Sequence, residues 1–298
     1  MSIEAWGMVC VGVAALAAGL VLVQPRFRAA SGAGKAVVLG PVFEAVALAI
    51  FAAEHFLAAR DLMNIVPRWL PWHLFWTYFF GVGLLAAAIS FILWRCVRWS
   101  APLLALFFLL IVATIDVPNM AAGLHDRFFW ILTVRETCFA AGAIVLAGSV
   151  WQNRAGGVLR IAGCAILAPS FVFYAIEHFL FPRHVPGVPL EKLTPQWMPA
   201  PTLIAYFVGV VLLLAGPALL IRRTRLIAAS GAGIVLVLLT AFFYVPILLT
   251  EIHTPLVVEG INYVGDTLLF AATALLAGFG ADPSMATAPI AARPATDK

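Results

Sequence analysis

The sequence has few charged residues, which make up 11% of its 298 positions. A soluble domain of this size usually carries about 25%. Apolar residues make up 63% of the chain, and the mean hydropathy is +1.03. A surface of this composition would aggregate in water. The composition therefore excludes an ordinary soluble protein and predicts an integral membrane protein whose surroundings are a lipid bilayer.

Long basic clusters and paired cysteines are also missing. The formal net charge is only +4, and the longest basic cluster is Arg-Arg-Thr-Arg at 222–225. A short basic link beside an apolar segment is typical of an orientation signal, so we expect no nucleic-acid partner. The cysteines stand singly within apolar runs, at Cys10, Cys96, Cys138 and Cys164. Without a CxxC pair, a thiol-redox centre or a zinc ribbon is not indicated, and we expect no metal site.

Long apolar runs dominate what is present. A membrane-spanning helix needs roughly 20 mostly apolar residues. Nine stretches qualify, and we expect an all-α polytopic membrane protein with about nine transmembrane helices. The stretches are 3–24, 36–59, 73–94, 100–118, 128–150, 158–181, 201–221, 226–248 and 260–280. The first stretch has no basic segment before it and no clear cleavage site, so we expect a retained span and not a signal peptide.

The links between the stretches differ in charge. The links on one side of the membrane hold ten Lys and Arg residues, and those on the other side hold five. Lys and Arg are enriched in cytoplasmic loops. This bias predicts an N-terminus outside and a C-terminus in the cytoplasm, and a bacterial inner membrane is the expected location. Trp69, Trp72, Trp76 and Trp197 flank the outer links, where we expect them to anchor at the membrane interface.

The sequence contains an internal repeat. The matched segments are 53–57 (AEHFL) and 176–180 (IEHFL), 67–71 (PRWLP) and 195–199 (PQWMP), 78–82 (YFFGV) and 206–210 (YFVGV), and 117–118 and 245–246 (both VP). The offset between the matched segments grows only within links, as a duplication allows. Each unit has four helices, an even number, so both units have the same orientation in the membrane.

This repeat divides the chain into four parts. We expect an N-terminal transmembrane helix with an inner link at 1–35 and a first four-helix unit at 36–150. A second four-helix unit at 151–280 and a disordered tail at 281–298 follow. The terms first unit and second unit refer to these ranges below.

The repeated motifs carry a family resemblance. A helix that ends in His-Phe, an outer Trp-x-Pro turn and a following glycine-containing helix resemble the DoxX-like family of four-helix membrane proteins. The resemblance covers 36–280 as two tandem units. The family is linked to membrane redox functions and includes a subunit of a thiosulfate:quinone oxidoreductase. The resemblance therefore implies a quinone as cofactor and a redox protein as partner, and it leaves open whether the chain is itself an enzyme.

Ionisable side chains within the spans are candidate site residues, because each costs about 2.5–3.5 kcal/mol near a helix centre. The catalytic candidates are Arg135, Glu136, Asp116 and Asp266. Glu136 and Asp266 hold matching positions in the two units and lie deeper than an end-capping role requires. An ion pair of Arg135 with Asp116 or Glu44 would make its burial tolerable. A purely structural ion pair explains the same residues and stays an open alternative.

The second unit lacks part of this set. Gly265 stands where the first unit has Arg135, and Tyr244 stands where it has Asp116. The charge pairing is therefore not duplicated, and the first unit is the better candidate for a site.

Two Glu-His pairs are the candidate cofactor-binding residues. They are Glu54 with His55 in the first unit, and Glu177 with His178 in the second. A histidine beside a carboxylate can hydrogen-bond a quinone carbonyl and pass a proton. It can also ligate a metal or a haem iron, although the spacing matches no named metal motif. Capping of polar backbone under the Pro-x-Trp-x-Pro link is the structural alternative.

Three functional hypotheses follow. The preferred one is a subunit of a membrane redox system that interacts with quinone near the outer face. The second is a proton-coupled small-molecule transporter, in which Glu136 and Asp266 are the coupling carboxylates. The third is a non-catalytic membrane scaffold that holds a partner protein.

Overall fold

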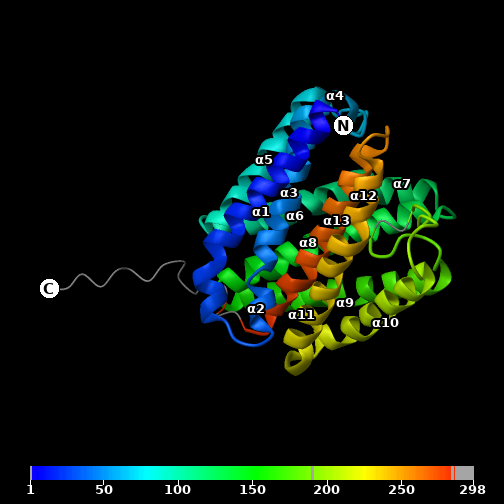
Figure 1. Cartoon of the computed structure of the whole chain (residues 1–298). Helices are drawn as coiled ribbons and strands as arrows, with labels where there is room; N and C mark the ends of the chain where they lie inside the picture. The colour runs from blue at the N-terminus through cyan, green and yellow to red at the C-terminus, as the bar shows by residue number, and fades with distance from the viewer. Residues whose placement is uncertain (1, 189–190, 283–284, 286–298) are drawn as a thin grey trace.

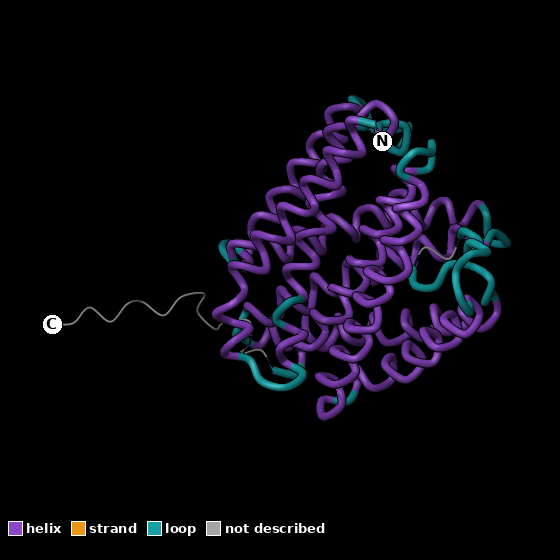
Figure 2. The backbone as a smooth tube through the Cα atoms, in the orientation of Figure 1, coloured by secondary structure: helices purple, strands orange, loops and turns teal. Residues whose placement is uncertain are grey.

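The computed structural model describes residues 2–188, 191–282 and 285, and within these ranges the chain is helical between short links and contains no strand (Figure 2). In the same ranges, nine helical segments are long and apolar enough to cross a membrane. They confirm the expected all-α polytopic membrane fold. The expected tail at 281–298 lies mostly outside the described residues, which include only 281, 282 and 285 of it.

The elements follow one another in this order: α1 (Ile3–Ala29), α2 (Gly34–Val37), α3 (Gly40–Leu57), α4 (Ala59–Leu62), α5 (His73–Leu93), α6 (Val97–Ile111), η1 (Val112–Asp116), α7 (Val117–Ala122), α8 (Arg127–Val150), α9 (Arg154–Leu180), α10 (Pro201–Leu220), α11 (Arg222–Leu239), η2 (Thr240–Tyr244), α12 (Val245–Glu251), α13 (Val257–Leu276) and η3 (Ala277–Gly280). Each expected span is found, and its ends lie within about a helical turn or so of the expected ones.

Helices α3, α8, α9 and α13 form the centre of the bundle (Figure 1). In the apolar part of the span that contains α13, 89% of the residues are buried, and in that of the span that contains α3 the share is 78%. Helix α8 packs along α9, and α13 packs along α3, so the last helix of each unit covers the first helix of the other. Small residues allow this close packing, since a Cβ added at Gly142 of α8 would lie 3.0 Å from the Thr273 side chain of α13.

Helix α1 lies at one edge of the bundle, beside α3 (Figure 1). Gly12 and Gly19 of α1 face Ile50 and Val42 of α3 at short distance. The rest of α1 is open, and only 28% of its span is buried. The open face carries side chains such as Val13, which lipid tails can cover without cost.

Each unit has a π-helical turn in its third span. Element η1 covers Val112–Asp116, element η2 covers Thr240–Tyr244 at the equivalent place in the repeat, and a Val-Pro pair follows each turn directly. Proline has no N–H to donate to the preceding turn, and a π-turn accommodates the missing hydrogen bond. Asp116 ends the first turn and Tyr244 the second, and both side chains are buried in the bundle.

The first two spans of each unit also approach each other in the same way. A Cβ added at Gly81 would lie 2.8 Å from the Cβ of His55, and one added at Gly209 would lie 3.0 Å from the Cβ of His178. The helices of each pair therefore approach each other closely beside the histidine. These matched features favour the expected duplication, which stays a prediction.

Candidate pocket in the first unit

A cavity of about 570 Å³ lies among the helices of the first unit. Its walls come from α3, α5, α6, η1 and α8, and α13 of the second unit closes one side. The link between α4 and α5 covers it at the end of the bundle where α1 begins (Figure 1). Cavities of about 300–1,000 Å³, mostly apolar with a few polar groups, are typical of small-molecule sites.

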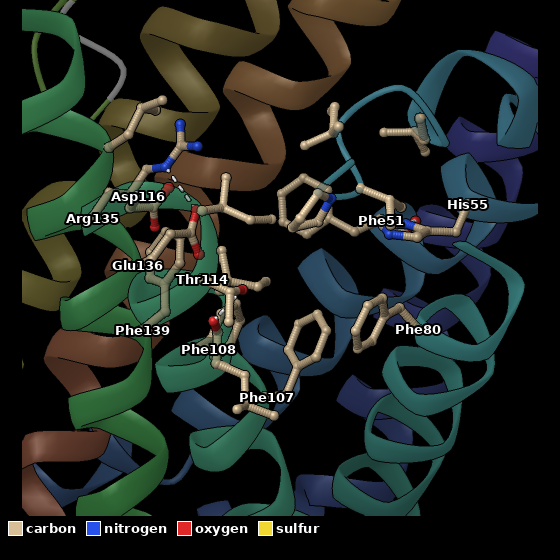
Figure 3. A pocket seen from close by; sticks show the side chains of 18 of the residues that line it. Phe51, His55, Phe80, Phe107, Phe108, Thr114, Asp116, Arg135, Glu136 and Phe139 are labelled. Carbon is tan, nitrogen blue, oxygen red and sulfur yellow. Dashed lines mark hydrogen bonds and ion pairs between the residues drawn. The ribbon is translucent and has the colours of Figure 1, made fainter. Parts of the chain in front are cut away.

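One wall of the pocket is a continuous row of aromatic rings. Neighbouring rings have centroids 5.0 to 6.1 Å apart, along the series Trp76, Phe80, Phe107, Phe108 and Phe139. Phe80 and Phe107 lie along the lower side of the pocket in Figure 3. Sequence reasoning treated Trp76 as an interface anchor and did not single out the phenylalanines. Their contact depends on how three helices pack, which no local pattern reveals.

A charged cluster forms one end of the pocket. The Nη1 atom of Arg135 lies 2.7 Å from the Asp266 carboxylate, and its Nε lies 3.3 Å from the Glu136 carboxylate. The expected partners of Arg135 were Asp116 or Glu44, and that expectation is wrong. Helix α13 packs against α8 and carries Asp266 to the guanidinium, so the ion pair joins the two units. Glu44 is not a partner of Arg135, because it lies ten residues before Glu54 on α3, about 15 Å farther along the helix axis.

His55 lies at the opposite end of the pocket (Figure 3). Its ring points into the pocket from α3, and its Nδ1 lies 2.8 Å from the carbonyl oxygen of Phe51. The preceding residue, Glu54, also lines the pocket and accepts a hydrogen bond of 2.9 Å from the Asn262 side chain of α13. Both ends therefore carry polar groups, and the aromatic wall separates them.

Several polar atoms that line the pocket are buried without a hydrogen-bond partner within the described part of the chain. They are Asp116 Oδ2, Asn262 Oδ1 and Trp76 Nε1. Buried polar atoms in native proteins are nearly always paired with protein, water or ligand. These three atoms lie behind the surface of the pocket, whereas the other carboxylate oxygen of Asp116, Oδ1, is not among the buried unpaired atoms.

Six of the eight candidate site residues line this one pocket: Glu54, His55, Asp116, Arg135, Glu136 and Asp266. The other two, Glu177 and His178, lie elsewhere and have partners of their own. Glu177 accepts a 2.6 Å ion pair from Nε of Arg127. His178 Nε2 accepts a 2.8 Å hydrogen bond from the backbone N–H of Gly187.

In the second unit, the link at 181–200 occupies the place that corresponds to the pocket of the first unit. The link folds back as a hairpin, since Val185 N–H donates to Lys192 O at 2.8 Å and Thr194 N–H donates to Arg183 O at 2.9 Å. Its tip at 185–188 is buried in the bundle. The Tyr244 hydroxyl donates to the carbonyl of Pro186, which holds the tip in place.

The aromatic wall is not repeated in the second unit either. At the positions that the repeat aligns with Trp76, Phe80, Phe107 and Phe108, the second unit has Ile204, Val208, Val235 and Leu236. Aliphatic side chains thus stand where the first unit presents flat rings. The aromatic pocket is a feature of the first unit.

Glu191 is a half-buried acid near the charged cluster that sequence reasoning missed. It lies in the hairpin, outside the spans, and its Oε2 has no hydrogen-bond partner among the described residues. Burial raises the pKa of Glu191 to about 7, against an opposing effect of the Arg135 charge. The neighbouring Lys192 holds the hairpin to the bundle through Glu251 and through Glu259 at 3.6 Å.

The described residues include no group of three His, Cys, Asp or Glu side chains placed to hold a metal ion.

The fold and the pocket define a polytopic α-helical membrane protein with a ligand-sized cavity in its first unit. The model of one protein family, described as a domain of unknown function (DUF8561), matches residues 44–128. This range contains Glu54, His55 and Asp116 and ends before Arg135. No curated protein and no solved structure matches the chain.

Proposed function

We propose that the chain binds a quinone-type ring in the first-unit pocket and serves as a membrane subunit of a redox system. The observation that carries this proposal is the combination of an aromatic wall with polar groups at two opposite ends. A quinone headgroup is a flat ring with oxygen atoms at opposite ends. Offset stacking on the aromatic wall would hold the ring, and the polar ends would bind the oxygens.

The surroundings of the pocket support a lipid-soluble ligand. Leu110 and Phe128 line the pocket and are also 47% and 43% exposed, so the pocket reaches the outer surface of the bundle. Both residues belong to spans, and that surface is apolar. An isoprenoid tail attached to the ring would extend through this opening into the lipid. The resemblance to DoxX-like proteins and the charge bias of the links support a site near the outer face of a bacterial inner membrane.

The residues of the chain have distinct roles under this proposal. A bound quinone supplies two-electron redox chemistry, and the partner redox protein exchanges the electrons. His55 and Asp116 orient the ring and accept protons, His55 at Nε2 and Asp116 at its carboxylate. Arg135, held between two carboxylates, fixes the charged end of the pocket and couples its geometry to the second unit.

Direct binding to the full chain in lipid nanodiscs tests the proposal. Decyl-benzoquinone should bind saturably beyond its partition into empty nanodiscs. Thr114 lies at the centre of the pocket (Figure 3), so Thr114→Trp should fill the cavity and weaken binding at least about tenfold. The matched control is Phe242→Trp, at the equivalent position of the second unit, where the side chain is 74% exposed, and it should bind as the wild type does. If neither decyl-benzoquinone nor its hydroquinone bound saturably to the wild type, the proposal would be contradicted.

Proton-coupled transport is a second candidate, favoured by the position of Glu136 and Asp266 on a single arginine between the units. A carrier alternates between states in which such carboxylates gain and lose protons. Under this function, proteoliposomes take up protons with substrate, and Glu136→Gln abolishes the uptake. Under the scaffold hypothesis, both Thr114→Trp and Glu136→Gln would leave partner binding unchanged.

A further inference from the structure

The second unit shows which hydrogen bonds a histidine makes at this place in the fold. Nδ1 of His178 lies 2.5 Å from the carbonyl oxygen of Tyr174, which can only accept, so Nδ1 carries the proton. Nε2 accepts the N–H of Gly187 at 2.8 Å. The imidazole is therefore neutral, with a protonated Nδ1 and an acceptor at Nε2. The hairpin supplies the hydrogen-bond donor that this acceptor requires.

His55 has the same local arrangement without a hairpin. Its Nδ1 lies 2.8 Å from the carbonyl oxygen of Phe51, four residues earlier, as in His178 and Tyr174. This bond places a proton on Nδ1, so the neutral form of the ring presents Nε2 as an acceptor to the pocket. A ligand that satisfies His55 must offer a donor, as the Gly187 N–H does in the second unit.

At the other end of the pocket, the two units differ in whether the side chain donates or accepts a hydrogen bond. In the second unit Tyr244 donates its hydroxyl hydrogen to the carbonyl of Pro186. In the first unit Asp116 takes that place, is buried, and has an unpaired Oδ2. A carboxylate only accepts, so here too the ligand must donate. Asn262 Oδ1 and Trp76 Nε1 are also unpaired among the described residues. The Arg135 guanidinium, which can only donate, lies at the same end of the pocket and is held by Asp266 and Glu136.

These acceptors lead to an inference about the redox state of the ligand, which rests on the proposed quinone function. We infer that the pocket binds the hydroquinone form in preference to the quinone form, with His55 Nε2 and the Asp116 carboxylate as acceptors for the two hydroxyls. A quinone has carbonyl oxygens only, and these would face the lone pairs of both acceptors. Sites built to bind a hydroxyl reject analogues that lack it, because buried polar groups then stay unpaired.

Anaerobic binding to the full chain in nanodiscs at about pH 8 tests this inference. The probes are decyl-hydroquinone with excess reductant and decyl-benzoquinone without it. A redox-inert analogue, decyl-1,4-dimethoxybenzene, keeps both ring oxygens but lacks the hydroxyl hydrogens, so it separates the loss of these hydrogens from the change of redox state. Decyl-hydroquinone should bind about 10–100-fold more tightly than either the quinone or the dimethoxy compound.

Variants locate the preference at the two acceptors. Asp116→Asn and His55→Gln each place an amide donor in the pocket, and each should lower the hydroquinone-to-quinone ratio about tenfold. The matched control, Tyr244→Phe in the second unit, should leave the ratio unchanged. Equal binding of both forms, or tighter binding of the quinone, would overturn the inference and leave the proposed function standing. If neither form binds saturably, the proposed function itself fails.

Discussion

The two units place a histidine, a π-turn and an acid-bearing last helix at matching positions, and the aromatic pocket lies in the first unit. In the second unit the hairpin at 181–200 supplies the partners of His178 and Tyr244. The spacing between the Glu-His-Phe motif and the Pro-x-Trp-x-Pro motif is larger in the second unit, so its link is longer than that of the first. The added length lets the link reach into the bundle. The second unit thus places a hairpin at the position where the first unit has a cavity.

The difference extends to the last helix of each unit. Arg135 of α8 has no counterpart in α13, where Gly265 lies so close to the Phe51 ring that an added Cβ would be 2.9 Å away. A long side chain does not fit there. Asp266 therefore has no cation from its own helix and pairs with Arg135 across the unit boundary. The pocket is a joint product of both units.

The largest expected effect follows from breaking this shared ion pair. Arg135→Leu leaves Asp266 and Glu136 without a cation at membrane depth, which should destabilise the fold by about 3–5 kcal/mol. Unfolding in mixed micelles measures the change. The double variant Arg135→Leu with Asp266→Asn should recover much of the stability, because one buried charge is removed with its partner. A single variant as stable as the wild type would show that the two units do not depend on this pair.

The hairpin tip provides a second test of the difference between the two units. Gly187 has φ +102, a region that side chains other than glycine rarely adopt. Gly187→Ala should destabilise the protein by about 1–3 kcal/mol and increase hydrogen exchange at 185–188. Gly231→Ala is the matched control, since a Cβ there meets nothing within 4 Å in helix α11. Equal exchange in both variants would show that the tip does not depend on the Gly187 backbone.

The docking of the hairpin should also depend on pH. Burial raises the pKa of Glu191 to about 7 from the ordinary 4.5, so the docked hairpin favours the neutral acid. This stabilisation is fully present below about pH 4.5 and is lost as the pH rises through about 7, on the order of 1–2 kcal/mol. Burial lowers the pKa of His184, which acts in the opposite sense. The proteolysis rate at the link of the wild type should therefore rise between about pH 5 and pH 8. The Glu191→Gln variant has no acid at this position, so its proteolysis rate should not rise over the same range. A wild-type rate that stays flat over this range would contradict the prediction.

Hydropathy was sufficient to predict the spans, because a bilayer demands a fixed length of apolar helix and leaves a long signal in the sequence. The repeat and the cost of buried charge also predicted that His55, Glu54 and Arg135 are candidate site residues. The sequence could not predict which carboxylate pairs with Arg135, because that depends on the packing of α8 against α13. Nor could it show that the link at 181–200 enters the bundle, since its buried tip reads as an ordinary Pro-Gly turn.

The smallest expected effect tests the difference between the two units at the aromatic wall. Phe107 contacts both Phe80 and Phe108, at centroid distances of 5.0 and 5.3 Å, and Val235 stands at the matching position of the second unit. Phe107→Val should weaken the binding of decyl-hydroquinone about three- to tenfold, because one stacking contact is worth about 0.5–1.5 kcal/mol. Val235→Phe is the reciprocal control and should not change binding, since no ligand stacks in the second unit. If the two variants weakened binding equally, the loss would come from general repacking, and the wall in the first unit would have no special role.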